Sequence, residues 1–230
     1  LLAKADLIAT VHRRAPIDLV VTARREAGKV VALDIAAGLW TSAALAARPD
    51  SVPVLRSHLA ALDVAHGFDA SAHSRKAFLH AVGALPRDIT TALDAEALGT
   101  LAMTAMSLID RPRTRLLLLP DVLDRHLMAF VWLPRDEMST ERRREIEAML
   151  IEATQGVLLS WSVDMRDDGL ALLRYTLCQR KGAPPPDADA LDQRLVEAVR
   201  GWAPAVEARL AALVAPGRAA RLALTYASAF

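Results

Sequence analysis

The chain alternates between short apolar runs, typical of β-strands, and longer stretches in which apolar residues recur at helical spacing. Residues 17–24 and 30–33 are apolar and rich in β-branched side chains, and a short loop with Gly28 separates them. Two such runs across a short glycine-containing loop predict a β-hairpin near the N-terminus.

Helical periodicity begins at residue 53. A helix is predicted over residues 53–65, with Gly67 at its end, and a second over residues 71–84, before residues 86–88 break the chain. Asp94 can cap a third helix. The predicted buried face of this third helix consists of Leu98, Leu101, Ala105 and Leu108.

From Thr114 onward, four apolar runs flank one helical stretch. The runs cover residues 115–119, 126–133, 158–165 and 170–177. Between the second and third runs, Ser139 can cap a helix that lasts to about Thr154 and ends at Gly156. Asp168-Gly169 predicts a tight turn between the last two runs. The order β-β-α-β-β predicts a sheet with a helix on one face, as in ferredoxin-like or ACT-like domains.

The C-terminal part is predicted to be helical. Residues 181–186 contain three consecutive prolines and predict a linker. Asp187 and Asp189 can each cap the helix that follows. Pro204 lies inside the helical pattern, so we expect a kink or break shortly before it, and a last short helix follows.

The predicted fold class is α+β and helix-rich. Residues 1–112 form a hairpin and a helical segment, residues 113–182 an ACT-like ββαββ unit, and residues 183–230 a helical segment. The chain begins without Met and ends without a polar tail. We therefore expect both ends to lie inside a longer polypeptide.

Composition argues against several classes of partner. Lys and Arg total 28 and Asp and Glu total 27, so a net charge of +1 gives no long-range attraction to nucleic acid or to an anionic membrane. No apolar run approaches the roughly 18 residues of a membrane-spanning helix. One cysteine, Cys178, permits no disulfide framework, so the cytoplasm is the expected compartment.

The motifs of cofactor chemistry are missing. None of the ten glycines lies two residues from another, so the chain has no Gly-x-Gly for a dinucleotide, and it also lacks a P-loop. No lysine stands in the glycine-rich setting of an amino-acid dehydrogenase, and no G-x-S-x-G supports a hydrolase. We therefore expect no catalytic, cofactor-binding or metal-binding residue in this chain.

Several polar residues invite a functional interpretation but have simpler ones. His66, His73 and His80 are seven residues apart, and two helical turns span about 10 Å, too far for one zinc ion. The Arg142-Arg143-Arg144 run is interleaved with glutamates, which predicts a solvated face. Cys178 is expected to be a buried structural thiol without an activating partner. The four tryptophans are expected to anchor a core or an interface.

One polar group is a candidate effector or interface site. Arg135 and Asp136 follow a predicted strand, and Ser139 precedes a helix. The free N–H groups of a helix N-terminus can bind an anion or a carboxylate. The alternative is that Asp136 and Ser139 only satisfy the turn and the helix cap.

Five segments in a consistent order resemble the large NAD-specific glutamate dehydrogenases of bacteria. The clearest is Phe130-Val131-Trp132-Leu133-Pro134-Arg135-Asp136-Glu137-Met138-Ser139-Thr140, similar to that family's strand, Pro-Arg-Asp and basic helix. The other segments that carry the resemblance are Thr10-Val11-His12-Arg13; Gly38-Leu39 with Thr41-Ser42-Ala43; Gly67-Phe68-Asp69 with Ser71, His73, Lys76 and Leu79-His80; and Leu191 with Arg194-Leu195-Val196-Glu197-Ala198 and Trp202.

The resemblance implies a non-catalytic region of an oxidoreductase of amino-acid catabolism. Such enzymes carry ACT-like, PAS-like and helical segments ahead of the catalytic core, and residues 1–112 could include the end of a PAS-like module. The full-length parent would bind NAD and oxidise glutamate, and the expected partners are its remaining domains, further copies in a homo-oligomer and an amino-acid effector. The alternative is an amino-acid-binding ACT-like sensor without enzyme activity.

The chain departs from the family at three places. Pro120-Asp121-Val122-Leu123 stands where arginines and an aspartate are usual, Met138 stands in place of a tyrosine, and Pro204 replaces a helix residue. Residues 120–123 therefore lack the basic groups that are available to the family for a ligand contact at this turn.

Overall fold

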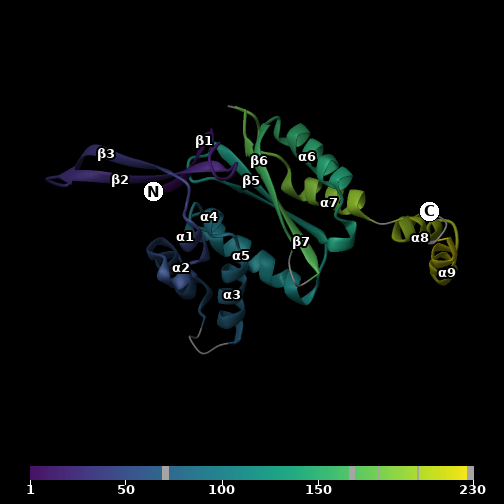
Figure 1. Ribbon diagram of the computed structural model, residues 1–230. Coiled ribbons are helices and arrows are strands. Elements are labelled where there is room, and N and C mark those ends of the chain that lie inside the picture. The colour runs from purple at the N-terminus through teal and green to yellow at the C-terminus, as the bar shows by residue number, and fades with distance from the viewer. Residues whose placement is uncertain (69–72, 166–168, 181, 201, 227–230) are drawn as a thin grey trace.

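The computed structural model describes residues 1–68, 73–165, 169–180, 182–200 and 202–226. It has an N-terminal three-stranded antiparallel sheet, a four-stranded sheet with helices on its faces, and C-terminal helices (Figure 1). The predicted α+β class with a ββαββ unit is confirmed. Within the described residues no helix is both long and apolar enough to cross a bilayer.

The N-terminal sheet consists of β1 (Leu2–Ile8), β2 (Pro16–Glu26) and β3 (Lys29–Gly38), in that order. The predicted hairpin β2–β3 is confirmed and is longer than expected. Ala27 and Gly28 form its two-residue turn with φ of 47° and 80°, the left-handed pair that matches strand twist. The sequence did not predict β1, because its buried residues Ala3, Lys4 and Ala5 include no large apolar side chain.

The helical segment connects the two sheets. Its elements are α1 (Ser42–Ala46), the 3-10 turn η1 (Pro49–Ser51), α2 (Pro53–His66), α3 (His73–Ala84), α4 (Arg87–Thr90) and α5 (Ala95–Asp110). The predicted end of α2 is confirmed, since Gly67 is left-handed with φ 61°, and so is the cap of α5, where Asp94 accepts the N–H of Ala97 at 2.8 Å. The start predicted at residue 71 for α3 lies outside the described residues.

Pro86 begins a short helix rather than only breaking the chain. It is the N-cap of α4, and its fixed φ of −61° suits that position. The sequence analysis missed α4, whose Arg87 is buried. The Arg87 guanidinium donates to the carbonyl oxygens of Ala47 at 3.0 Å and Gly83 at 3.3 Å, so it joins α1 to α3.

The larger sheet has the strand order β4-β5-β7-β6, and every neighbouring pair is antiparallel. Its elements are β4 (Arg115–Pro120), β5 (His126–Pro134), the 3-10 turn η2 (Arg135–Glu137), α6 (Thr140–Thr154), β6 (Val157–Met165) and β7 (Leu170–Cys178). The four predicted strands and the helix are confirmed. The turn predicted between β6 and β7 falls partly on residues 166–168, which lie outside the described residues.

Helices cover both faces of this sheet, whereas the sequence predicted a helix on one face. Phe130 and Trp132 of β5 point into a core shared with α2, α3 and α5. Val131 and Leu133 point the other way, into a core with α6 and α7 (Ala188–Val199). Figure 1 shows these two layers on opposite sides of β5 and β7. The division of the chain after residues 112 and 182 stays a prediction, since these cores extend across both points.

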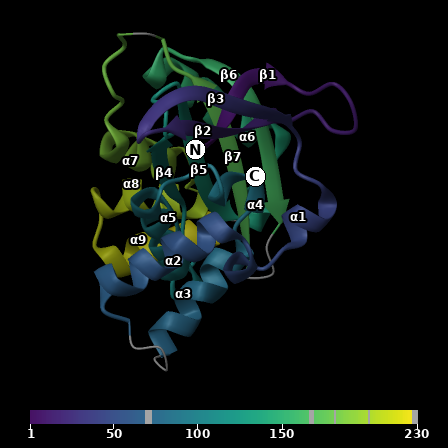
Figure 2. The same cartoon turned by 90° about the vertical axis from the view of Figure 1, so that its left-hand side faces the viewer.

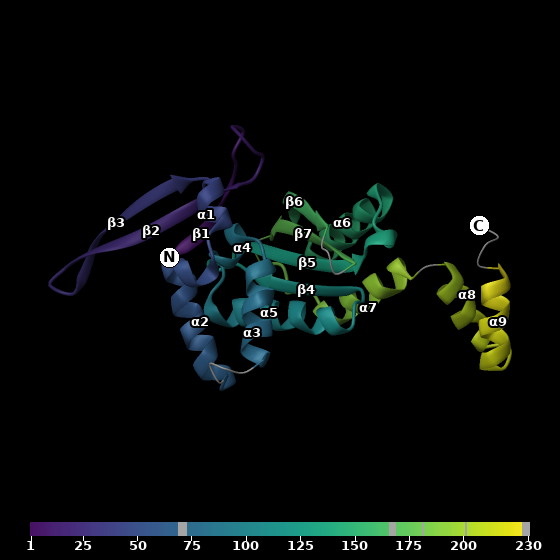
Figure 3. The ribbon, with the colours of Figure 1, turned by 60° about the horizontal axis from the view of Figure 1, so that its bottom comes forward.

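The C-terminal helices α7, α8 (Trp202–Ala211) and α9 (Pro216–Tyr226) follow the prediction of a break before Pro204. Asp187 caps α7 by accepting the N–H of Ala190 at 3.0 Å. Pro204 is the third residue of α8, within the first turn, where a missing N–H costs no helical hydrogen bond. In Figure 3, α8 and α9 lie beyond the far end of α7, opposite the β2–β3 hairpin.

The end of α6 corrects the sequence analysis. Gln155, not Gly156, is the left-handed C-cap, with φ 50°. Gly156 is required for a different reason: a Cβ there would lie 2.7 Å from the carbonyl oxygen of Cys178 and 3.0 Å from Thr154 Oγ1. The glycine therefore permits the close approach of β6 to the end of β7.

A buried lysine joins the N-terminal sheet to the rest of the molecule. Lys4 is 3% exposed, and its Nζ lies 2.5 Å from Asp18 and 3.4 Å from Asp88 of α4. Asp88 also lies 3.7 Å from Arg174 of β7. Burial raises the pKa of Asp18, although the neighbouring Lys4 ammonium opposes this shift. This ion-pair network therefore connects the N-terminal sheet to α4 and to β7 of the larger sheet.

Because β5 is buried on both faces, we expect Trp132→Ala to lower the free energy of unfolding strongly. Trp132 is 1% exposed, and deletion of a buried aromatic side chain costs about 3–5 kcal/mol. Trp161→Ala on β6 is the matched control: Trp161 is 46% exposed and lies 4.4 Å below the Arg143 guanidinium, a contact worth about 1 kcal/mol. Urea unfolding followed by circular dichroism measures both, and equal losses would contradict the assignment of the core.

The buried Lys4–Asp18 ion pair predicts that removing one charge lowers stability more than removing both. Lys4→Met leaves Asp18 buried without its counter-charge, which costs about 3–5 kcal/mol, and the double variant Lys4→Met/Asp18→Leu should recover most of that loss. The exposed pair of Arg24 with Asp34, 3.9 Å apart, provides the control, because Arg24→Met should change stability by less than about 1 kcal/mol. A double variant as unstable as Lys4→Met would rule out charge burial as the cause.

Candidate functional site

The three residues predicted as an effector or interface site lie together at the turn between β5 and α6. Ser139 caps α6, since its hydroxyl accepts the N–H of Arg142 at 3.1 Å. Arg135 and Asp136 are exposed in η2, and the Arg135 N–H donates to Gly169 O at 3.0 Å. Among the described contacts, no hydrogen bond or ion pair joins the side chains of these three residues. Ser139 thus has the structural role, and an effector role for the group stays a prediction.

A shallow cleft of about 410 Å³ adjoins this turn, between β4 and α7. Arg115 pairs with Asp192 at 2.6 Å, and the other Asp192 oxygen accepts the Leu116 N–H at 2.6 Å. Arg113 and Arg200 also line the cleft. Asp192 therefore serves mainly to fix α7 against the sheet edge.

The basic run on α6 is only partly a solvated face. Arg143 forms an ion pair with Glu147, four residues later on the same helix. However, the Arg143 side chain is only 12% exposed, since its guanidinium stacks on Trp161. The Tyr175 hydroxyl donates to the Arg143 carbonyl at 3.0 Å, and burial raises the Tyr175 pKa. Arg143 therefore helps to hold α6 on β6 and β7.

A second cavity, of about 290 Å³, lies where the N-terminal sheet meets β6 and β7. Figure 2 shows the N-terminal sheet crossing the end of the larger sheet at this place. The polar residues around the cavity are Lys4, Arg13, Arg14, Asp88, Ser160, Ser162, Arg174 and Thr176. Arg174 Nε is buried and has no hydrogen-bond partner among the described residues. The cavity therefore offers charges of both signs and several hydroxyl groups.

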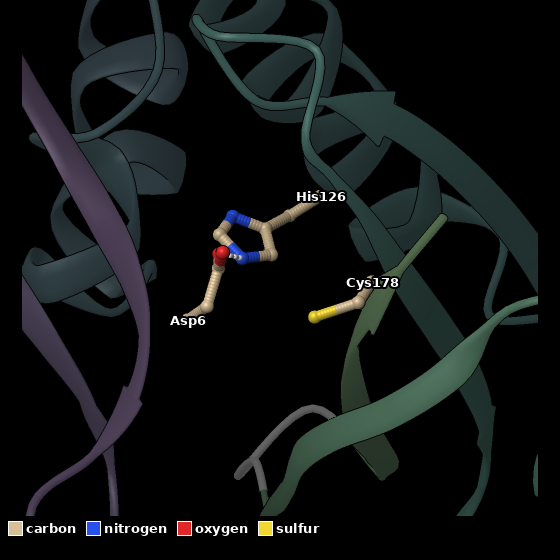
Figure 4. Close-up of side chains that lie close together, drawn as sticks. All are labelled: Asp6, His126 and Cys178. Carbon is tan, nitrogen blue, oxygen red and sulfur yellow. Dashed lines mark ion pairs between the residues drawn. The ribbon is translucent and has the colours of Figure 1, made fainter. Parts of the chain in front are cut away.

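A third group of polar side chains lies at the same junction and comes from three strands. Asp6 of β1, His126 at the start of β5 and Cys178 at the end of β7 bring a carboxylate oxygen, a ring nitrogen and a sulfur within 4.8 Å of one another (Figure 4). His126 and Cys178 are directly paired in the sheet register. Among the described residues, this is the one such group whose atoms could hold a metal ion.

Hydrogen bonds fix the orientation of the His126 ring. Its Nδ1 lies 3.1 Å from Asp121 Oδ2, and Asp121 Oδ1 accepts the N–H groups of Arg125 at 2.7 Å and His126 at 3.1 Å. Burial opposes ionisation of Asp121, but these hydrogen bonds outweigh it and lower its pKa. Asp121 is therefore an ionised carboxylate that holds the buried ring from one side.

Cys178 differs from the sequence-based expectation. It is half-buried rather than buried, and it has His126 and Asp6 as neighbours. Burial and the nearby Asp6 carboxylate raise the pKa of the Cys178 thiol, so the geometry does not favour a nucleophile. The sequence analysis missed this group because residues 6, 126 and 178 show no common spacing, and only strand pairing brings them together.

The described strands do not form a dinucleotide site of the Rossmann type. The Rossmann site requires parallel strands joined through a helix, with the pyrophosphate at the helix N-terminus. Every strand pair in the described part of the chain is antiparallel. No step of NAD chemistry is therefore assigned to these residues.

A family model and a search of curated proteins both relate this chain to the same kind of protein. Residues 115–203 match the family described as "Glutamate dehydrogenase, ACT2 domain". The NAD-specific glutamate dehydrogenase of Halomonas elongata is 28% identical over 204 residues, which cover 87% of this chain and 12% of that protein. The enzymes with this name from Pseudomonas aeruginosa and Mycobacterium tuberculosis are each 27% identical, over 87% and 84% of this chain. No solved structure gives a significant match.

The chain spans about 12% of the length of these curated relatives. The order β4-β5-α6-β6-β7, with α7 packed on the sheet, occupies the residues that match the family. The chain is therefore homologous to one region of the large NAD-specific glutamate dehydrogenases, and its residues 115–203 match their ACT2 domain.

Proposed function

We propose that this chain is a non-catalytic regulatory and assembly region of an NAD-dependent glutamate dehydrogenase. The match of residues 115–203 to the ACT2 family is the observation that carries the proposal. The full-length enzyme would oxidise glutamate to 2-oxoglutarate and ammonium with NAD, in the cytoplasm. Its catalytic and NAD-binding residues would lie elsewhere in the longer polypeptide.

Exposed apolar side chains support a role in assembly. Val31, Leu33 and Ile35 of β3 are each more than half exposed, and Leu7 of β1 is too. Alternate residues of a strand point to the same face, so Val31, Leu33 and Ile35 form an exposed apolar row on β3, which is uncommon on isolated soluble domains. The proposed partners of this surface are the remaining domains of the same polypeptide, with further copies completing a homo-oligomer.

The cavity of about 290 Å³ favours a second function, that of an amino-acid sensor. A free amino acid carries a carboxylate and an ammonium group at short distance. Arg14 and Arg174 could bind the carboxylate and Asp88 the ammonium group, with Ser162 and Thr176 as hydrogen-bonding partners. The unpartnered Nε of Arg174 supports this assignment, because a buried donor gains stability from an acceptor.

The proposed non-catalytic role predicts that the 230-residue chain has no dehydrogenase activity. Purified protein mixed with glutamate and NAD should produce no NADH above the rate without protein, measured by the absorbance of NADH. A full-length relative assayed in parallel shows that the conditions support turnover. Glutamate-dependent NADH formation by this chain alone would contradict the proposal.

The sensor function predicts that at least one amino acid binds in the cavity. Calorimetry with the common amino acids should give a saturable heat, and Arg174→Met should weaken that binding by about tenfold or more, the loss of one charged hydrogen bond. Arg115→Met is the matched control: Arg115 is also a strand arginine of this sheet paired with an aspartate, Asp192 of α7, but it lines the other cleft. If no amino acid gives heat, the sensor function is wrong and the assembly role stands alone.

A further inference from the structure

The strongest unassigned chemistry in the molecule is the group formed by Asp6, His126 and Cys178. These residues belong to three strands, and two of the strands belong to the larger sheet while the third belongs to the N-terminal sheet. We propose that Asp6, His126 and Cys178 form a binding site for a divalent transition-metal ion of the zinc type. The proposal does not rest on the regulatory function proposed above.

The position of His126 Nε2 is the first argument. The residue is 1% exposed, and Nε2 is buried without a hydrogen bond of acceptable geometry. Asp6 Oδ1 lies only 2.7 Å from it, the distance of an ion pair, as the dashed line in Figure 4 marks. A buried nitrogen beside a carboxylate, with no hydrogen bond between them, is better satisfied by a cation that both atoms can share.

The second argument is the group on the opposite side of the ring. Zinc-binding histidines commonly donate the other ring N–H to a carboxylate, which fixes the tautomer and orients the metal-binding nitrogen. Here Nδ1 of His126 lies 3.1 Å from Asp121, and two backbone N–H groups hold Asp121 in place. With the proton on Nδ1, the lone pair of Nε2 is directed towards Asp6 and Cys178.

The set of donor atoms selects the kind of ion. Zinc accepts sulfur, imidazole nitrogen and carboxylate oxygen, whereas magnesium and calcium require oxygen ligands. Ligands at about 2.0–2.3 Å from a tetrahedral ion are about 3.3–3.8 Å apart. The widest spacing, up to 4.8 Å, therefore needs a contraction of about 1 Å, while Asp6 Oδ1 and His126 Nε2, now 2.7 Å apart, must separate by about 0.6 Å or more. Asp6 is 60% exposed and can make this movement, and solvent can supply a fourth ligand.

The charges around the group are compatible with a cation. Two carboxylates, Asp6 and Asp121, face His126, and one guanidinium, Arg125, lies 3.7 Å from Asp6. The Arg125 Nη2 instead donates to the Lys4 carbonyl at 2.6 Å. A bound ion would therefore connect β1 to the ends of β5 and β7, at the junction that the Lys4 network also stabilises.

Cobalt(II) is the test probe, because a cobalt–thiolate bond gives a near-ultraviolet charge-transfer band. Cys178 is the only cysteine in the chain, so this band can arise only from it. Titration of the full 230-residue chain should give the band and a four-coordinate visible spectrum, which saturate at one Co²⁺ per chain. Added Zn²⁺ should displace both signals.

Three variants and one control complete the test. Cys178→Ala should abolish the band, while Asp6→Asn and Asp121→Asn should each weaken Co²⁺ binding about 10- to 100-fold. Asp34→Asn is the matched control, since Asp34 is also an exposed strand aspartate near an arginine, and should bind like the parent chain. Circular dichroism confirms that each variant is folded. No band in the parent chain, or a band that persists in Cys178→Ala, would overturn the proposal.

Discussion

The burial of β5 and β7 on both faces is the constraint on which the rest of the structure depends. Successive side chains of a strand point to opposite faces, so Phe130 and Trp132 need one helical layer while Val131 and Leu133 need another. The helices do not cover all of the larger sheet, because Ser162 of β6 and Arg174 of β7 line the cavity of about 290 Å³. Polar groups also collect at the ends and edges of the strands, which is where the cleft of about 410 Å³ and the Asp6, His126 and Cys178 group are found.

Features of the fold with a local cause could be predicted from the sequence. The caps at Asp94, Ser139 and Asp187 and the hairpin turn beside Gly28 each depend on a few consecutive residues. Strand β1 could not be predicted in this way. Its one charged buried residue is Lys4, whose partners Asp18 and Asp88 are distant in sequence. The same reason explains why one helical layer was predicted and two are present.

The candidate sites also differ in whether their residues are close together or distant in the sequence. The turn of Arg135, Asp136 and Ser139 is contiguous in sequence, and its location after a strand and before a helix was predicted correctly. The group of Asp6, His126 and Cys178 depends on the register that pairs the first residue of β5 with the last of β7. A shift of that register by one residue would turn one of these side chains to the other face. No pattern in the sequence predicts this register.

The shared core on the Phe130 and Trp132 face has a consequence for how residues 115–203 could be exchanged between relatives. The helices that cover this face, α2, α3 and α5, all precede residue 115, where the family match begins. The segment that matches the family therefore begins at residue 115, whereas the core that it packs into also includes helices before that residue. An exchange of residues 115–203 between relatives would join one protein's aromatic face to another protein's helices. A change of side-chain volume on α5 therefore needs a matching change on β5 to keep this core filled, so residues 115–203 cannot be exchanged as an independent module without such changes.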